Sequence, residues 1–520
     1  MRAIRAVWSS SCLTASARHD KMIRRVLPSL LLLACTPTRT IDVSLVIRDC
    51  RDQSTLLSST MQLRVTAFGP DMDPIVSSVN VGVGGISLSG IPVGSARRLR
   101  VEALTAPPPD GVLVARGDSG PFDLTAKAPD RVTVFLRRVD GFTSTNDASD
   151  GRRCTRMGVA RAGHSMTLLP DGRVLLAGGF KASGGGKVYL SDAEIYDPKT
   201  GTFSAATSSG GGHAFAAAVS LPDGVLVTGG EYLAEPGQSE RYDAGHAIWE
   251  RLTMQVPRSH HSATVDGAGR VLVAGGLSTA ERDAPGLIRS LEFFDPAKRT
   301  LVASSAALAT GRANQAAFAL SSGAVMVAGG SDATNAALAS VEGFLFVVAD
   351  YAPVASLARL VLSTPRARPA SALIGPDLAL VAGGFNSTFA ASARYSSIAS
   401  TLEIIDARSE KPIVLPALNM SSARADACAA GFEGIGGVVI GGAANLGSGL
   451  ASLNSVDVVA ASDAAGTQFH VRPVARAMAT ARHLAACLRL GDGTILVTGG
   501  LHAVGDGTVT TVDSAEIYTP

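Results

Sequence analysis

The amino-acid sequence predicts an all-β protein in which a small β-sandwich precedes a β-propeller of seven four-stranded blades. Three observations predict this fold class. Charged residues make up 17% of the 520 residues and Gly is abundant at 56, a composition typical of short strands and tight turns. Apolar runs that end in paired glycines recur seven times after residue 150. Short alternating apolar runs fill the roughly 100 residues before that point.

The first segment, 1–35, is predicted to be a leader that carries a secretory signal. From Met22, two arginines are followed by the apolar run Val26–Ala34 and then by Cys35. The Leu-Leu-Ala-Cys ending resembles the lipobox of bacterial lipoproteins, which implies that Cys35 is acylated and becomes the first residue of the mature chain. By the same resemblance, Thr36 after the cysteine implies the outer membrane. A plain signal peptide with an incidental cysteine is the alternative.

Residues 36–140 are predicted to form a small Ig-like β-sandwich. Apolar and polar residues alternate in runs such as IDVSLVI, MQLRVTAF and LRVEAL, and Pro-rich and Gly-rich turns separate the runs. The polar, turn-rich stretch GFTSTNDASDG then predicts a linker over 141–150. The propeller is expected to occupy 151–520.

Paired glycines define the repeat. Each pair ends an apolar run such as RVLLAGG or TILVTGG, and glycine there permits close approach of another backbone at a strand end. Asp-Gly signals in front of several runs, as in LPDGR, predict a tight hairpin between the first two strands of each blade. The first glycines of the pairs are Gly178, Gly229, Gly275, Gly329, Gly383, Gly441 and Gly499.

An arginine and a carboxylate recur at fixed places around each glycine pair. The residue 17 positions before the pair is arginine in every repeat but the second, which has Gly212: Arg161, Arg258, Arg312, Arg366, Arg424 and Arg482. The third strand of each repeat carries one acid: Glu194, Glu240, Glu292, Glu342, Glu403, Asp457 and Glu516. Residues present in every blade are expected to build the blade, so we interpret them as a repeated, partly buried ion pair.

A first strand, paired glycines, a Glu-x-Tyr-Asp strand and an aromatic fourth strand together resemble the kelch repeat. The resemblance covers about 150–520 and implies a kelch-type β-propeller with seven blades. The seventh repeat ends at AEIYTP, directly after its third strand. Residues near 151–157 are therefore expected to supply the missing fourth strand and to close the ring.

Two cysteines are placed where neighbouring blades would meet. Cys428 and Cys487 lie 13 and 12 residues before their glycine pairs, on the innermost strands of the sixth and seventh blades. Their opposite parity directs the side chains toward each other, so the sequence allows either a disulfide across the blade interface or two buried thiols.

The histidines are the clearest indication in the sequence of a possible metal or catalytic site. Five lie near the starts of innermost strands, where they could converge on a metal, although ordinary structural roles are the favoured interpretation: His164, His213, His260, His261 and His483. A copper enzyme resembling galactose oxidase would also need tyrosines at these inner positions, and there are none. We therefore expect no catalytic residue, no metal site and no cofactor.

The loops after the glycine pairs differ from blade to blade and are predicted to form the ligand face. Its candidate residues are Lys187, Tyr189, Tyr232, Arg282, Asn386, Arg394, Tyr395 and His502. Their polar character favours a protein or polysaccharide partner over a buried apolar cofactor. A net charge of +2 without long runs of one sign argues against nucleic acid.

The sequence as a whole predicts a monomeric binding protein of the bacterial cell envelope, attached to the membrane only by an N-terminal lipid. If the leader is a plain signal peptide, the protein is secreted instead. The alternative function is a sugar-acting enzyme on the same scaffold, such as a galactose-oxidase-like oxidase or a sialic-acid-epimerase-like enzyme.

Overall fold

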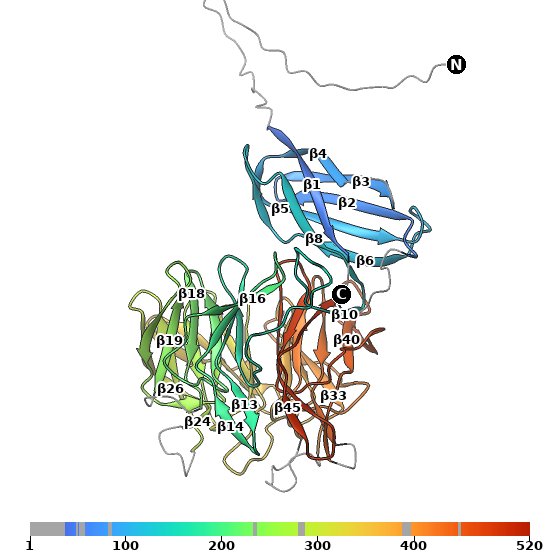
Figure 1. Cartoon of the computed structure of the whole chain (residues 1–520). Helices are drawn as coiled ribbons and strands as arrows, with labels where there is room; N and C mark the ends of the chain where they lie inside the picture. Colours follow the sequence, from blue (N-terminus) through green and yellow to red (C-terminus); the bar gives the residue numbers. More distant parts are fainter. Residues whose placement is uncertain are drawn as a thin grey trace, which may run out of the picture. The chain divides into compact units, whose positions relative to one another are not determined.

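The structure, a computed structural model, is built almost entirely of strands (Figure 1). It describes residues 37–47, 50, 58–81, 86–231, 237–278, 286–386, 397–445 and 449–520. One short 3₁₀ helix, η1 (Leu357–Arg359), occurs among these residues. No helix in these ranges is long and apolar enough to cross a membrane.

The N-terminal described residues form two sheets that share one apolar core, a β-sandwich. One sheet has the order β4 (Ile86–Pro92), β1 (Thr38–Val46) and β8 (Arg131–Phe135). The other has the order β3 (Met72–Asn80), β2 (Gln62–Gly69), β5 (Gly94–Leu104), β6 (Leu113–Asp118) and β9 (Arg137–Arg138), and β7 (Phe122–Leu124) also pairs with β5. Alternate residues of β2 and β5, such as Val65 and Val101, are buried in the core. The period-two pattern of the sequence therefore corresponds to one buried face on each strand.

The rest of the described chain forms seven sheets, the blades. Blades one and two are β11 (Ser165–Leu168), β12 (Val174–Ala177), β15 (Ala193–Asp197) and β16 (Thr202–Ala206), then β17 (Ala217–Leu221), β18 (Gly224–Thr228), β19 (Gln238–Asp243) and β20 (Ile248–Thr253). Blades three and four are β22 (Ser262–Val265), β23 (Val271–Ala274), β25 (Ser290–Asp295) and β26 (Thr300–Ala307), then β27 (Ala316–Ala319), β28 (Val325–Ala328), β29 (Val341–Val347) and β30 (Asp350–Pro353).

The last three blades follow the same order. Blade five is β31 (Ala370–Gly375), β32 (Leu378–Ala382) and β33 (Thr401–Asp406), with β34 (Ile413–Val414) and β35 (Leu418–Asn419) sharing the outer position. Blade six is β36 (Cys428–Gly431), β37 (Gly436–Ile440), β40 (Val456–Ala461) and β41 (Phe469–Pro473). Blade seven is β42 (Ala486–Arg489), β43 (Ile495–Thr498), β46 (Ala515–Thr519) and β10 (Gly141–Ser144).

The first strands of the blades contact one another in a closed circuit. The order of contact is β11, β17, β22, β27, β31, β36, β42 and back to β11. The sheets pack face to face around this circuit, so the second strand of each blade is buried on both faces. In β28, Val325 and Val327 pack against blade three, whereas Met326 and Ala328 pack against blade five. Continuous apolar runs such as AVMVAGG follow from this double burial.

Ring closure differs from the prediction in its position. The outer strand of blade seven is β10, which lies within the stretch expected to be a linker and about ten residues before 151–157. Phe142 of β10 is 4% exposed and packs against Tyr518 of β46, with ring centroids 5.2 Å apart. The stretch 151–157 adds only isolated bridges, such as that between Arg156 and Ser514. The ring is closed by β10 because the Phe142 side chain can be buried there. Residues 151–157, which were expected to close the ring, contribute little strand pairing.

Four smaller two-stranded sheets lie at the ends of the blades, and all but the second are hairpins. They are β13 (Phe180–Ser183) with β14 (Gly186–Tyr189), β21 (Arg258–Ser259) with β24 (Leu277–Ser278), β38 (Ala443–Asn445) with β39 (Leu450–Ser452), and β44 (Leu501–Ala503) with β45 (Val509–Thr511). Three of them belong to loops that follow glycine pairs, and β24 also begins directly after one. The described parts of the variable loops therefore lie at the same end of the blades as the starts of the innermost strands.

Candidate functional site

The repeated arginine and carboxylate form a buried ion pair in each blade that has the arginine. The nitrogen to oxygen distances run from 2.5 to 2.9 Å, and the six arginines are at most 1% exposed. The pairs are Arg161–Glu194, Arg258–Glu292, Arg312–Glu342, Arg366–Glu403, Arg424–Asp457 and Arg482–Glu516. Both members of each pair belong to the same blade.

Blade five shows how the pair holds the scaffold together. Arg366 donates to the carbonyls of Gly383 at 3.0 Å and Thr401 at 2.8 Å, as well as to Glu403. Its own carbonyl accepts the N–H of Gly330, the second glycine of the preceding pair, at 2.7 Å. The side chain thus joins strands within one blade, and the backbone joins two blades. We assign the repeated residues to the scaffold.

Blade two uses a histidine in place of the arginine. His213, one position after Gly212, is fully buried, and its Nδ1–H donates to the Gly229 carbonyl at 2.7 Å. Its Nε2 lies 2.8 Å from Glu240. His213 therefore fills the position of the missing arginine and is not free to bind a ligand.

The other predicted histidines do not converge on one point. His164 bonds Thr498 at 2.9 Å and His261 bonds Thr228 at 2.8 Å, each across a blade boundary, and burial lowers the pKa of His164 to about 3. His483 bonds a serine of blade six. Within the described ranges, no group of three or more His, Cys, Asp or Glu residues could hold a metal ion.

A ring of backbone hydrogen bonds surrounds the axis at the starts of the innermost strands. Its members, one per blade and each two positions after the repeated arginine or His213, have φ between 52° and 57°. Six N–H groups donate to the ring carbonyl of the preceding blade at 2.9–3.1 Å. We call this set the axial ring: Gly163, Phe215, His260, Asn314, Arg368, Asp426 and Leu484.

The seven members of the axial ring share one backbone conformation but differ in their side chains. Left-handed φ is uncommon for residues such as Phe215, Arg368 and Leu484 and costs about 1–3 kcal/mol per residue. Such strained positions cluster at functional sites, where the surrounding structure holds them. Since six of the seven members are not glycine, the ring presents different side chains at the axis on a regular frame.

A cavity of about 270 Å³ opens beside the axial ring. Its lining includes the ring members Asn314, Arg368 and Asp426, and the residues that follow two of the ring members, His164 and Gln315. The Arg368 guanidinium lies 3.2 Å from the Asp426 carboxylate, so these two charges compensate each other. The ion pair makes the cavity polar but adds no net charge to it.

A second charged network adjoins the cavity and joins three blades. Glu231, directly after the glycine pair of blade two, accepts hydrogen bonds from Lys187 and from the Tyr189 hydroxyl, both at 2.9 Å. His260 Nε2 donates to the other carboxylate oxygen at 3.1 Å, and the His260 ring stacks on Phe215 with centroids 4.3 Å apart. Lys187 Nζ lies 4.8 Å from the Phe215 ring centroid.

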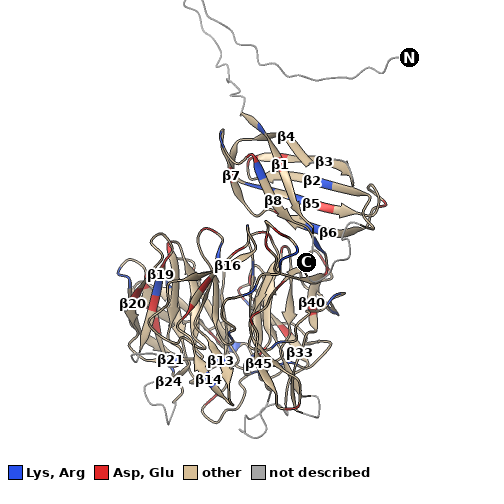
Figure 2. Ribbon diagram, in the orientation of Figure 1, with Lys and Arg blue, Asp and Glu red and all other residues tan. Residues whose placement is uncertain are grey.

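Burial and these partners set the charges of the network. Burial alone would raise the pKa of Glu231, but the His260 hydrogen bond and Lys187 outweigh it and lower that pKa to about 2. Burial lowers the pKa of His260, with Glu231 opposing. Near neutral pH the network thus holds an ionised Glu231 beside a neutral His260. Figure 2 shows acidic and basic positions interspersed along the blades.

Comparison with known proteins agrees with this geometry. The Kelch motif family model matches residues 160–210. The solved structure of a fungal alcohol oxidase of the AA5 family, in complex with copper, is similar with a TM-score of 0.51 and 16% identity, over 69% of this chain and 74% of that one. The chain contains a kelch-type β-propeller.

Two further comparisons complete this picture. The structure of YjhT is similar to the kelch-type propeller with a TM-score of 0.44 and 13% identity, over 59% of this chain and 94% of that one. No curated protein sequence matches significantly. At these identities the structural likeness concerns the fold, and the function has to be argued from the site itself.

The structure brings two of the predicted ligand-face residues of the kelch-type propeller together. Lys187 and Tyr189 meet at Glu231, as described above. Asn386 is exposed, and His502 Nδ1–H donates to the Ala481 carbonyl at 2.9 Å, away from that network. The other candidates lie outside the described residues, as does the lipid-attachment candidate: Tyr232, Arg282, Arg394, Tyr395 and Cys35.

Sequence reasoning missed most of the axial ring as part of a site. Arg368, Asp426 and Asn314 share no residue type, so no repeated letter marks them. The signal that could have found them is positional, because each lies two residues after the repeated arginine.

The described part of the chain contains two disulfides, one within the kelch-type propeller and one between the propeller and residue 50. Cys428 and Cys487 are bonded with Cα atoms 6.0 Å apart, which resolves the two sequence alternatives in favour of the bond across blades six and seven. Cys50 and Cys154 form the second bond, with Cα atoms 5.1 Å apart, which the sequence did not predict.

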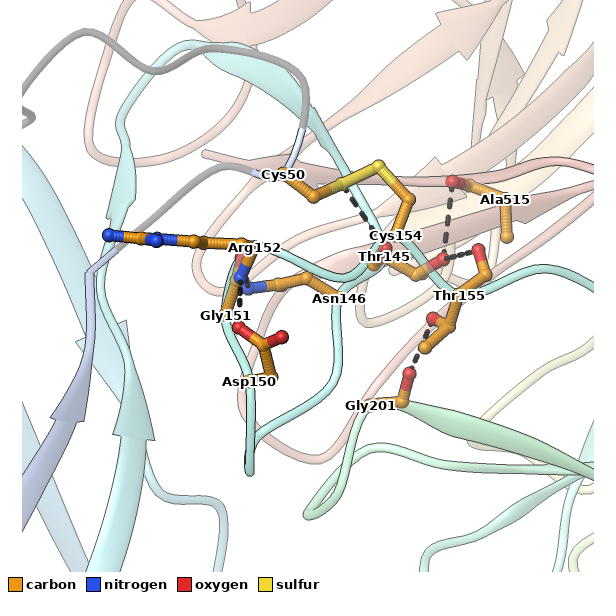
Figure 3. The surroundings of a disulfide bond; sticks show 10 residues. All are labelled: Cys50, Thr145, Asn146, Asp150, Gly151, Arg152, Cys154, Thr155, Gly201 and Ala515. Carbon is orange, nitrogen blue, oxygen red and sulfur yellow. Dashed lines mark hydrogen bonds between the residues drawn. A yellow bond between two sulfur atoms is a disulfide. The ribbon is translucent and has the colours of Figure 1, made fainter.

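Figure 3 shows the Cys50–Cys154 bond against the segment that follows β10. There the Thr145 N–H donates to the Ala515 carbonyl at 3.2 Å, and the Thr145 hydroxyl donates to the Thr155 carbonyl at 2.9 Å. The bond therefore fixes residue 50 beside the place where the ring closes.

Proposed function

We propose that this chain is a polysaccharide-binding protein of the bacterial cell envelope and that its ligand enters from the variable-loop end of the kelch-type propeller. The axial ring carries this proposal. It presents Phe215, Asn314, Arg368 and Asp426 beside a 270 Å³ cavity, while Lys187 and its network stand at the rim. A fold that maintains left-handed backbone at six non-glycine positions favours a site over plain packing.

The charge pattern favours a polysaccharide over a protein partner. Arg368 is paired with Asp426 and Lys187 with Glu231, so the site offers many hydrogen-bonding groups and little unbalanced charge. Protein interfaces depend on large apolar and aromatic anchors at their centre. A concave site of modest volume with convergent polar groups suits a hydroxyl-rich ligand better.

Envelope location and lipid attachment through Cys35 are part of this proposal. Disulfides form and persist in oxidising compartments, and the described chain contains Cys428–Cys487 and Cys50–Cys154. The Leu-Leu-Ala-Cys ending then supplies the attachment residue, with the outer membrane as destination. The protein acts as a monomer and meets the membrane only through its lipid. Incorporation of labelled palmitate into the expressed chain, and its loss in Cys35→Ser, tests this part.

One observation favours a second candidate, a sugar-acting enzyme. His260 is neutral, buried and hydrogen-bonded to the ionised Glu231 next to the cavity, and such a pair can move a proton to or from a bound ligand. Chemical change of a retained saccharide, followed by NMR and abolished by His260→Gln, would favour this candidate over simple binding.

Affinity electrophoresis of the full chain through gels that contain neutral or acidic polysaccharides tests the main proposal. We expect retardation by at least one polysaccharide and weaker retardation of Lys187→Met. Lys298→Met, which removes an exposed lysine from the turn after β25, serves as the matched control and should behave as wild type. Unretarded migration in every gel would contradict the proposal.

A further inference from the structure

We infer that the cavity beside the axial ring binds one uncharged sugar residue, through hydrogen bonds from its hydroxyl groups to the unpartnered acceptors of His164 and Gln315. This inference rests on the proposed polysaccharide-binding function and names the ligand unit and the residues that would recognise it.

His164 supplies the first acceptor. The residue is 8% exposed, lines the cavity, and its Nε2 lies 2.9 Å from the Thr498 hydroxyl oxygen. The Thr498 hydroxyl donates its single proton to Met166 Sδ at 3.3 Å, so its oxygen accepts the Nε2–H of a neutral His164. Nδ1 is then an acceptor, and it is buried without a partner among the described residues.

Gln315 supplies the second acceptor. Its amide nitrogen donates to Ser262 Oγ at 3.3 Å and to the Ala274 carbonyl at 2.8 Å, which uses both of its N–H groups. Its Oε1 is buried without a partner in the part of the chain that the structure describes. A buried acceptor without a donor is destabilising, so a ligand that donates to Gln315 and His164 recovers this loss.

The remaining lining decides between charged and uncharged sugars. Two unpartnered acceptors and the Asp426 carboxylate disfavour an incoming carboxylate, and the only cavity-lining guanidinium described, that of Arg368, is already engaged with Asp426. Hydroxyl groups can donate to all three acceptors. Phe215, Pro369 and Ala427 line the same cavity and provide apolar surface for the C–H groups of a sugar ring. The volume of about 270 Å³ lies just below the usual range for drug-sized ligands, which fits one sugar residue.

Competition on the wild-type full chain is the first test and needs no variant. A polysaccharide that retards the chain is offered as the immobilised ligand, with free glucose, galactose, mannose or glucuronate as competitors. We expect a neutral hexose to release the chain and glucuronate to be at least tenfold weaker. Equal or stronger release by glucuronate would overturn the inference.

Substitution at Gln315 is the second test. Gln315→Leu removes the acceptor and should weaken binding of the same polysaccharide about tenfold, the equivalent of one hydrogen bond of about 1.4 kcal/mol. Gln468→Leu, at an exposed position in the turn before β41, is the matched control and should bind as wild type. Thermal unfolding of both variants shows whether the fold is retained.

The outcomes separate this inference from the proposed function. Polysaccharide retention that is unaffected by Gln315→Leu and by every free hexose would refute the cavity as the sugar site while leaving polysaccharide binding intact. Absence of retention by any polysaccharide would refute both. If Gln315→Leu is unfolded, the free-sugar competition decides alone.

Discussion

Removing one arginine of the repeated ion pair should destabilise the propeller far more than removing an exposed one. Arg366 and Glu403 are both fully buried, and Arg366 also donates to the Gly383 and Thr401 carbonyls. Arg366→Met leaves a buried carboxylate without its cation, a loss of about 3–5 kcal/mol in the free energy of unfolding. Glu403 keeps the N–H groups of Ser363 and Thr364, at 2.6 and 3.2 Å, which places the expected loss toward about 3 kcal/mol.

Urea unfolding followed by tryptophan fluorescence measures this loss. Only two tryptophans occur in the sequence, and one of them, Trp249, lies in β20 of the propeller. The matched control is Lys298→Met, whose partner Asp295 lies three residues away on an exposed turn and whose loss should cost about 1 kcal/mol or less. The double variant Arg366→Met/Glu403→Leu should lose less than the sum of the two single variants, because no charge is then stranded. A loss for Arg366→Met no larger than that of the control would refute the role given to the pair.

Three further predictions concern pH, the second disulfide and ring closure. The pKa of His164 is about 3 in the folded chain against an ordinary 6.5, so the unfolded chain binds the proton first as the pH falls. The urea midpoint should therefore fall as the pH drops from 6.5 toward about 3. A His164→Asn variant with the same pH dependence as wild type would contradict this. Replacing Cys50 and Cys154 with serine, or reducing them, should cost about 2–5 kcal/mol in unfolding free energy, and unchanged urea midpoints would count against the bond. Phe142→Ala should cost about 3–5 kcal/mol because Phe142 packs in the core of blades six and seven; a loss under about 1 kcal/mol would mean that β10 is not seated there.

The scaffold could be predicted because every blade packs against its neighbour in the same way. Glycine pairs reappear where the backbone of the next blade passes close by: a Cβ on Gly383 would lie 2.2 Å from the Arg424 carbonyl oxygen. Arg366 and its counterparts reappear because the carbonyls beside each glycine pair need a donor. Because the blades share the same structural requirement, the same residue types recur at the same spacing, and this repeat can be recognised in a single sequence.

The closing strand and the site could not be predicted, for opposite reasons. Gly141–Ser144 is short and lies in a polar stretch, so only Phe142 marks it, and its partner β46 lies more than 350 residues away. The axial ring repeats its φ values and its backbone hydrogen bonds but varies its side chains, which leaves no repeated letter to find. The Cys50–Cys154 bond spans 104 residues, and cysteine spacing alone does not reveal such a pairing.

Hydrogen exchange in the last strand tests the closed ring of seven blades most directly. If β10 pairs with β46 (Ala515–Thr519), then β46 is an interior strand, and its amides should exchange as slowly as those of β43 in the same blade. The outer strands β16 and β26 provide the reference for an unpaired edge. We expect a C-terminal peptide that covers β46 to match β43; exchange as fast as in β16 and β26 would show that the ring is not closed by β10.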